Sequence, residues 1–263
     1  MKDLEFASPK EVRKLFKKEV LTKPTAGMAR GYAQANLIIL PEELAFEFMV
    51  FAFRNPKPCP LLDVLEPGQF EPVLTSPGAD IRTELPKYRV YKNGVLEEEV
   101  TNIKDYWEKD FVSFLIGCSF TFEDALLKSD IPIRHIEENR NVPMYITNID
   151  CKKAGRFNGP LVVSMRPLPA NLVSKAVQIS AEYEDVHGAP VHIGSPQEIG
   201  IDDINDPDFG EAVTIKENEI PVFWACGVTP QAVIMKSKLP FVITHSPGHM
   251  FITDIKNENL SSY

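Results

Sequence analysis

The sequence predicts an α/β fold, in which a mixed sheet carries flanking helices and the chain forms two lobes. Short apolar runs typical of buried strands, such as residues 111–116 (FVSFLI), alternate with amphipathic stretches typical of helices. The 22 prolines are spread along the chain and separate these segments. A strand, a cysteine-containing loop and a helix start also occur together twice, at Cys118 and at Cys226, as an internal duplication would produce.

Two helices and a hairpin are predicted in the first hundred residues. Residues 8–11 (SPKE) match a capping box with proline at the first helical position, and apolar residues follow at helical spacing as far as Val20. A second helix begins at Pro41 and stops before Pro56. In residues 88–100 (YRVYKNGVLEEEV), two short runs flank Asn-Gly, which predicts a hairpin with an acidic face toward solvent.

The rest of the chain predicts further strands and one long helix. The helix is expected at residues 171–183, and the strands at residues 143–149, 161–165, 221–225 and 241–244. No segment of linker composition marks a domain boundary. We expect residues 1–118 and 220–263 to form the main lobe and residues 119–219 the second.

Composition and charge exclude several classes of protein. The 263 residues are 44% hydrophobic and 25% charged, as in ordinary globular proteins. A net charge of -9 without a basic stripe argues against nucleic acid as a partner. The longest apolar run, residues 49–53, is too short to cross a membrane, and no signal peptide precedes it, so a cytoplasmic location is expected. The four scattered cysteines indicate free thiols, and apolar excess on the helices indicates a homo-oligomer.

The two cysteine loops align with each other. When FWACGVTPQ is placed under LIGCSFTFE, Cys226 falls on Cys118 and Thr229 on Thr121. Thr229 is placed to cap a helix, and a thiol beside a helix N-terminus favours the thiolate and binds carboxylates. We therefore expect the two loops to face one another across a cleft. The alternative is that both cysteines are small buried residues at tight turns.

Two arginines are candidates for binding a carboxylate. Arg82 in GADIR and Arg166 in SMRP each lie beside a turn or a strand end, and guanidinium binds carboxylate in a bidentate geometry. Strand ends usually face the site in α/β folds, which favours Arg166. Asp80 is either a base or the partner of Arg82. The alternative for both arginines is that they tie loops together through backbone carbonyls.

Four of the five histidines lie in HGAPVHIG and THSPGHM. The prolines and glycines there rule out the helical spacing of a metalloprotease motif, so no metal is expected. His187 or His245 is the better acid–base catalyst, although a histidine that holds a loop by hydrogen bonds is the common alternative. No GxSxG, GxxxxGK or GxGxxG motif is present, and cofactor-free chemistry is therefore expected.

With these stretches in view, the chain resembles the family of hydro-lyases that includes bacterial and mitochondrial D-glutamate cyclases. The resemblance covers nearly the whole chain, and Glu84 departs from it where aspartate is expected. It is carried by GYAQANLIILP, NPKPCPLL, GADIRTELPKY, FLIGCSFTFEDAL, VPMYITNIDC, VVSMRP, HGAPVHIG, PVFWACGVTPQ and THSPGHMFITD. It implies a two-lobed α/β fold and conversion of D-glutamate to 5-oxo-D-proline with loss of water.

Roles for the candidate residues follow from that chemistry. One arginine would hold the α-carboxylate, His245 would take the ammonium proton, and loop amides near the cysteines would polarise the reacting carboxyl. Cys226 would act as a nucleophile through a thioester or as a neutral acid, and a lysine forming a Schiff base stays open. Gln34, Asn36, Thr229 and His187 complete the expected substrate-binding set. The alternatives are a lyase or isomerase on another small carboxylic acid, and a carboxylate-binding protein without catalysis.

Overall fold

The structure is a computed structural model that describes residues 4–261, and its strands form two sheets. The larger sheet has the order β2-β5-β1-β10-β3-β4, with β11 also pairing to β1. Its strands are β1 (Tyr32–Pro41), β2 (Leu61–Leu65), β3 (Tyr88–Lys92), β4 (Val95–Val100), β5 (Phe111–Gly117), β10 (Phe241–His245) and β11 (Phe251–Lys256). The smaller sheet has the order β6-β7-β9-β8. Its strands are β6 (Met144–Asp150), β7 (Pro160–Pro169), β8 (His192–Ile193) and β9 (Glu219–Ala225).

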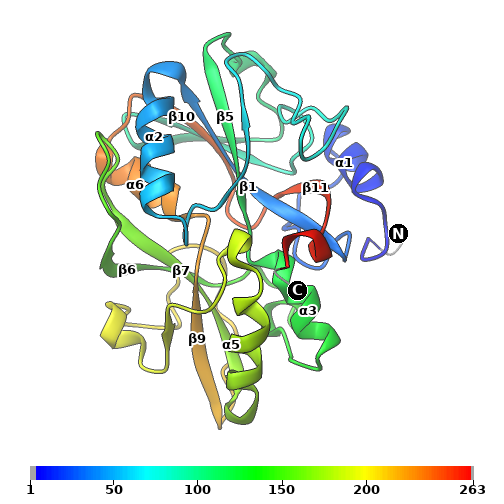
Figure 1. Cartoon of the computed structure of the whole chain (residues 1–263), viewed down its shortest axis with the longest axis vertical. Helices are drawn as coiled ribbons and strands as arrows, with labels where there is room; N and C mark the ends of the chain where they lie inside the picture. The colour runs from blue at the N-terminus through cyan, green and yellow to red at the C-terminus, as the bar shows by residue number, and fades with distance from the viewer. Residues whose placement is uncertain (1–3, 262–263) are drawn as a thin grey trace.

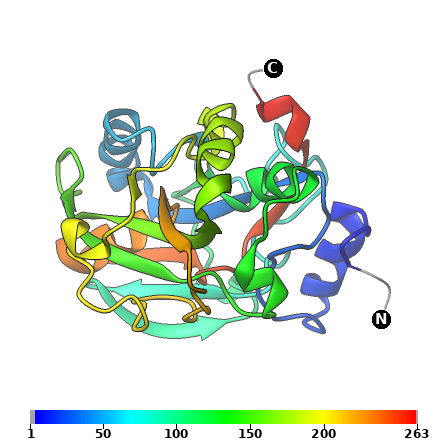
Figure 2. The same cartoon turned by 90° about the horizontal axis from the view of Figure 1, so that it is seen from below.

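Helices flank both sheets, as the predicted fold class requires. In Figure 1 the larger sheet occupies the upper half of the molecule and the smaller sheet the lower half, and Figure 2 shows several helices along one side. The helices are α1 (Pro9–Lys17), α2 (Glu42–Arg54), α3 (Phe120–Lys128), α4 (Arg134–Glu137), α5 (Val173–Ala181) and α6 (Thr229–Ser237).

The main hydrophobic core lies between the two sheets. It unites buried side chains from β1, α2 and β5 with others from β7, β9 and α6. Phe48 of α2 is central to it, because its ring lies 4.8 Å from that of Phe114 and 5.3 Å from that of Phe157. Fully burying such a side chain contributes about 1.5–3 kcal/mol. The two lobes therefore share this core, and each sheet packs a further cluster of its own on its other side chains.

Several predicted elements are confirmed. Ser8 and Glu11 form the capping box at the start of α1. Asn93 and Gly94, with φ of 52° and 75°, form the turn of the β3–β4 hairpin. The second helix begins directly after Pro41, and the apolar run at residues 111–116 is the fully buried strand β5.

Other predictions are corrected by the structure. The first helix ends at Lys17, which leaves Val20 68% exposed rather than on the buried stripe. All strand pairings in residues 4–261 are antiparallel, so the expectation that strand ends face the site, which holds for parallel α/β sheets, does not apply. The main lobe was expected to resume at residue 220, but β9 (Glu219–Ala225) still belongs to the smaller sheet. The chain therefore returns to the larger sheet only after Ala225. The central strand β1 was not predicted, because the buried polar residues Gln34 and Asn36 interrupt its apolar run.

The strand–cysteine loop–helix unit does occur twice, with equivalent strand pairing. Ala35 of β1 lies opposite Gly117 of β5, and the equivalent pair in the other sheet is Val163 of β7 with Ala225 of β9. When the residue numbers of each strand are shifted by a constant, every β1–β5 pair becomes a β7–β9 pair. Strand β10, which follows the Cys226 unit, pairs with β1, the partner of β5. In the same way β6, which follows the Cys118 unit, pairs with β7, the partner of β9. This interlocking brings the two cysteine loops together.

Candidate functional site

The two cysteine loops meet in one buried cluster. Cys118 and Cys226 belong to it together with Val142 and Met250. Each loop closes with the same backbone bond, from the third residue after the cysteine to the cysteine carbonyl, and each is 3.0 Å long. The structure thus brings the two predicted cysteines together, and it does so inside the protein.

Burial decides the protonation state of both thiols. It raises the pKa of Cys118 well above its ordinary range, and it raises the pKa of Cys226 to about 11. A backbone N–H two residues further on lowers each pKa, but by less than burial raises it. Both groups are therefore neutral thiols at pH 7, and the prediction of a thiolate at the helix N-terminus is wrong.

A labelling experiment tests this protonation state. Because only the thiolate is alkylated and both thiols are buried, native protein at pH 7.5 should take up iodoacetamide at Cys118 and Cys226 at least tenfold more slowly than unfolded protein. Peptide mass spectrometry against time gives the two rates. Labelling of Cys226 in the native protein as fast as in urea would show an accessible thiolate and contradict the assignment.

Three predicted substrate-binding residues instead form hydrogen bonds to the backbone of the protein. Thr229 is the first residue of α6 and does not cap it; its hydroxyl donates to the Cys226 carbonyl at 2.7 Å and accepts from the Val162 amide at 3.0 Å. The side-chain amide of Gln34 donates to the Thr25 carbonyl at 3.0 Å, and that of Asn36 to the Gly117 carbonyl at 2.7 Å. Their donors are thus used by the backbone.

Only glycine fits at position 227, because the side chain of Asn36 packs directly against it. A Cβ atom there would lie 1.9 Å from the side-chain nitrogen of Asn36. We expect Gly227→Ala to lower the free energy of unfolding by about 1–3 kcal/mol, because it displaces Asn36 and breaks its bond to Gly117. Urea denaturation measures this loss. The same change made in an Asn36→Ala background should cost markedly less, and an equal cost in both backgrounds would contradict the contact.

Arg166 lies within β7 and is fully buried, so it is not at a strand end as predicted. Its guanidinium forms an ion pair with Glu123 of α3 and donates to the hydroxyls of Ser119 and Ser164, both at 3.0 Å. His135 approaches the same carboxylate oxygen of Glu123, with its Nε2 at 3.3 Å. With these donors engaged, Arg166 ties β7 to α3 and does not clamp a substrate carboxylate.

Asp80 and Arg82 lie away from the cysteine loops. They pair with each other at 2.9 Å, and the Arg82 guanidinium stacks 3.5 Å from the ring centroid of Phe70. It also approaches Trp107, which packs on Phe111 at the start of β5. Cys118 follows the opposite end of that strand, about 20 Å along it. Asp80 is the partner of Arg82, the second of the two readings that the sequence allowed.

The two predicted catalytic histidines are buried and neutral. Nδ1 of His187 lies 2.7 Å from the Lys57 carbonyl, and Nδ1 of His245 lies 3.2 Å from the backbone of Leu37. Burial lowers the pKa of His187 to about 4 and that of His245 to about 3. His187 holds its loop against the Lys57 segment, which is the alternative that the sequence left open, whereas His245 joins β10 to the neighbouring strand β1.

A groove opens between the lobes, but neither Cys118 nor Cys226 lines it, so it is not the expected cleft between the cysteine loops. It consists of two adjoining pockets, of about 490 Å³ and about 180 Å³, which share Pro24, Asn141 and Glu211. One wall comes from β3, β4 and the loop before β11, and the other from residues 135–141 and 208–211. We call this the interlobe groove. Small-molecule sites of roughly 300–1,000 Å³ commonly lie at such junctions.

Both signs of charge line the interlobe groove. Lys87 and Arg89 approach one carboxylate, Glu99, at 3.0 Å and 3.2 Å. Burial raises the pKa of Glu99, but hydrogen bonds from Ser246, Lys87 and Arg89 outweigh this and hold the pKa at about 2. Two positive charges thus face one negative charge, which leaves a net positive end able to attract an anion.

The opposite wall presents carboxylates that backbone amides hold in place. Asp208 accepts from the Ile146 amide at 2.7 Å, and Glu211 accepts from the Asn141 amide at 2.9 Å. No lysine or arginine in residues 4–261 forms an ion pair with either of them. This wall is therefore suited to bind a cation such as an ammonium group.

His249 lines the groove between these features and was not among the predicted site residues. Burial lowers its pKa, whereas the carbonyls of Pro247 and Thr22 favour the charged form and limit the effect. Nδ1 lies 3.0 Å from the Pro247 carbonyl, so in the neutral ring Nδ1 carries the proton and Nε2 is a proton acceptor. The motif THSPGHM held the sequence signal for this residue. Gly248, at φ of 79°, turns the chain after β10, and this turn brings His249 rather than His245 to the groove.

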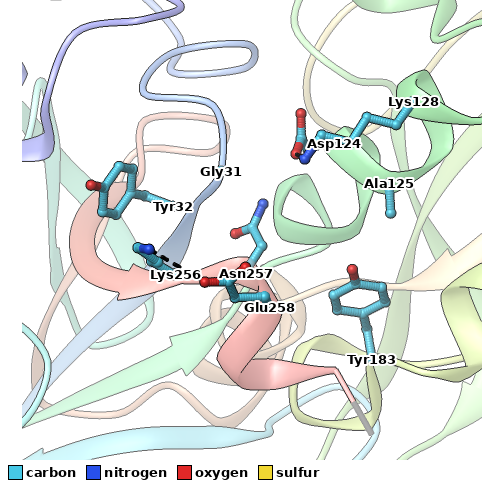
Figure 3. A pocket seen from close by; sticks show the side chains of 9 residues that line it. All are labelled: Gly31, Tyr32, Asp124, Ala125, Lys128, Tyr183, Lys256, Asn257 and Glu258. Carbon is cyan, nitrogen blue, oxygen red and sulfur yellow. Dashed lines mark hydrogen bonds and ion pairs between the residues drawn. The ribbon is translucent and has the colours of Figure 1, made fainter. Parts of the chain in front are cut away.

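A second pocket of about 310 Å³ lies between α3 and the segment after β11 (Figure 3). Its charged side chains are already paired with one another or with Arg30. Lys128 lies 2.7 Å from Asp124, which Arg30 also approaches at 2.9 Å, and Lys256 lies 3.3 Å from Glu258. The interlobe groove, with uncompensated charge and a histidine, is the better candidate for chemistry.

Within residues 4–261, no three histidine, cysteine or acidic side chains come together in a way that would hold a metal ion. In the same part of the chain, no helix has the length and apolar character needed to span a bilayer.

Comparisons with known proteins identify the family. A sequence model of D-glutamate cyclase matches residues 112–254. A relative from Thermoanaerobacter sp. (strain X514) is 64% identical over 96% of both chains. One from Geobacillus kaustophilus (strain HTA426) is 63% identical over 97% of this chain and 98% of its own. One from Stutzerimonas stutzeri (strain A1501) is 58% identical over 96% of both chains. All three are named "Putative hydro-lyase". The chain therefore belongs to the D-glutamate cyclase family.

Proposed function

We propose that this chain converts D-glutamate to 5-oxo-D-proline and water in the interlobe groove. The observation that carries the proposal is the lining of one groove by a net positive cluster, by two unpaired carboxylates and by the neutral histidine His249. Family membership supports the reaction class.

The charges of the groove fit a dicarboxylic amino acid. Lys87 and Arg89 would hold one carboxylate, and Asp208 with Glu211 would receive the ammonium group. Binding at both ends would bend the substrate chain so that its nitrogen approaches the distal carboxyl carbon, which is the geometry that ring closure needs. Arg82 and Arg166, which the sequence favoured for this role, are engaged elsewhere.

The proton balance of the reaction suits a single histidine. The substrate ammonium loses two protons, a nitrogen–carbon bond forms, and a carbon–oxygen bond of the distal carboxyl breaks. The departing oxygen leaves as water with those two protons, so nothing is released to solvent. Nε2 of His249 would accept a proton from the ammonium and return it to the leaving oxygen, as general base and then general acid. A neutral imidazole is the required starting state, and the lowered pKa of His249 provides it.

Arg89→Gln tests the substrate-binding role of the groove. We expect KM for D-glutamate to rise roughly 10-fold or more, because a charged hydrogen bond contributes about 1.5–3 kcal/mol. Product formation is followed by chromatography of 5-oxoproline. Arg82→Gln is the matched control, since this arginine lies outside the groove, and its KM should stay unchanged.

The same variants separate the alternative functions. Thermal protection by D-glutamate that Arg89→Gln removes, without any turnover, would indicate a carboxylate-binding protein. Protection by a different small carboxylic acid would indicate another lyase or isomerase. Equal protection in wild type and Arg89→Gln would contradict the placement of the site.

A further inference from the structure

A third pocket, separate from the interlobe groove, surrounds a lysine. It measures about 280 Å³ and is lined by Lys57, Glu184, His187 and Gly188, with proline and alanine side chains completing the wall. None of these residues lines the interlobe groove. Lys57 belongs to NPKPCP and His187 to HGAPVHIG, so the fold brings together two of the unusual motifs of the sequence.

The amine of Lys57 is available for chemistry. In the part of the chain that the structure describes, no carboxylate lies within ion-pair distance of its Nζ and no hydrogen bond engages it. The side chain is half-buried, and burial lowers its pKa more than the through-space attraction of Glu184 raises it. A lysine whose ammonium is destabilised in this way gains population as the neutral, nucleophilic amine.

The backbone keeps the space in front of this amine open. A Cβ atom at Gly188 would lie 3.9 Å from Nζ of Lys57, so glycine leaves room there that any side chain would take. His187 precedes it at φ of 86°, and its ring is fixed on the Lys57 carbonyl at 2.7 Å. Prolines at positions 56 and 58 restrict the chain on either side of the lysine.

We propose that Lys57 binds a small aliphatic aldehyde in this pocket as a reversible imine. The amine nitrogen adds to the carbonyl carbon, and the carbinolamine loses its oxygen as water when the carbon–nitrogen double bond forms. The proton that the ammonium loses returns to the leaving hydroxyl, which departs as water. Glu184 attracts the positive charge of the iminium through space, whereas it would repel the carboxylate of an oxo acid. The apolar remainder of the wall favours a neutral aldehyde as well.

Reductive trapping tests the proposal without any reading of D-glutamate turnover. Native protein is incubated with propionaldehyde and sodium cyanoborohydride at pH 7, and modified lysines are located by peptide mass spectrometry. We expect Lys57 to be modified at least tenfold faster than the exposed Lys128 and Lys256. Lys57→Arg should abolish the fast phase, and Lys236→Arg, on the exposed end of α6, should leave it intact.

A second variant makes the test independent of the lysine itself. Gly188→Ala should slow the trapping of Lys57 at least tenfold, because its methyl group enters the space beside Nζ. A circular dichroism spectrum like that of the wild type confirms that the variant is folded. Uniform labelling of all exposed lysines, an unchanged rate in folded Gly188→Ala, or faster trapping with pyruvate than with propionaldehyde would each overturn the proposal.

The outer face of α2 carries three exposed apolar side chains. Phe46, Met49 and Phe53 lie on one side of this helix and are 75%, 42% and 85% exposed. Figure 1 shows α2 on the outside of the molecule. Exposed phenylalanines at this spacing form an apolar stripe of the kind found at protein interfaces.

We infer that a second copy of this chain covers the stripe, with the two α2 helices antiparallel. A two-fold axis between Met49 and Val50 would place Phe46 of each copy on Phe53 of the other. It would also bring Glu42, at the helix start, within one turn of Arg54 at the end of the other helix. The ends of α2 carry opposite charges, so the face is self-complementary.

Sedimentation equilibrium tests this pairing. The wild type should sediment as a dimer of the 29.6 kDa chain, and Phe53→Glu should sediment as a monomer. Phe6→Glu, at an equally exposed phenylalanine elsewhere, should stay dimeric. A monomeric wild type, or a dimer that Phe53→Glu leaves intact, would overturn the inference.

Discussion

His249→Gln is expected to reduce kcat for 5-oxo-D-proline formation by about 10²–10⁴-fold, the range typical of a general acid–base group. Glutamine keeps a polar side chain of similar reach but cannot accept and return a proton. The buried His245→Gln is the matched control: it changes the neighbouring histidine, which does not line the groove. A fall in kcat with His245→Gln and none with His249→Gln would reverse the assignment.

The pH profile gives this prediction a second readout. The pKa of His249 lies below its ordinary value, so the ring is neutral at pH 7 and loses its ability to accept a proton only in more acidic solution. In the wild type, kcat/KM should therefore be constant near neutrality and fall as the pH drops through that lowered pKa. The acidic limb should disappear in His249→Gln, whatever activity is left.

Arg166→Met is expected to destabilise the folded protein by about 3–5 kcal/mol, because it leaves a buried carboxylate, Glu123, without its main partner. Urea denaturation at pH 7 measures the loss. The double variant Arg166→Met, Glu123→Gln removes both charges and should recover much of that stability. A loss as large in the double variant would show that packing of the arginine stem, and not the ion pair, is responsible.

The ion pair between Arg166 and Glu123 also makes the stability of the folded protein depend on pH. Burial raises the pKa of Glu123, but its interactions with His135 and Arg166 outweigh burial, and the folded-state pKa is lowered. A carboxyl group with a depressed folded-state pKa contributes stability above its unfolded-state pKa, and that contribution is lost as the pH falls through the folded-state value. The wild type should therefore lose stability in acid more steeply than the double variant, which lacks the carboxylate.

Local signals predicted much of the fold because they act within a few residues. The capping box at Ser8, the Asn93–Gly94 turn and the apolar run of β5 each carry their own physical cause and appear where expected. Strand β1 was missed because Gln34 and Asn36 make it look half polar, although their side-chain amides donate to the buried carbonyls of Thr25 and Gly117. Which strands pair, and that the pairs are antiparallel, depends on contacts between residues far apart in the sequence.

The candidate site was less accessible to sequence reasoning for a similar reason. The juxtaposition of Cys118 and Cys226 could be predicted, because one loop pattern occurs twice. Their protonation could not, because burial is a property of the folded protein and outweighs the helix N-terminus. Arginines and histidines in unusual motifs attracted functional roles, yet Arg166 and His245 are buried supports. The positive charges of the groove, Lys87 and Arg89, lie at the start of an ordinary hairpin that no motif singles out.

The most direct test of the account is to incubate the purified wild-type chain with D-glutamate, and separately with L-glutamate, and to measure 5-oxoproline by chromatography over time. The account predicts that the D isomer yields 5-oxoproline with an equal molar loss of D-glutamate, and that His249→Gln almost abolishes it. No 5-oxoproline from D-glutamate above the enzyme-free rate, with protein that is folded by circular dichroism, would contradict the proposed function.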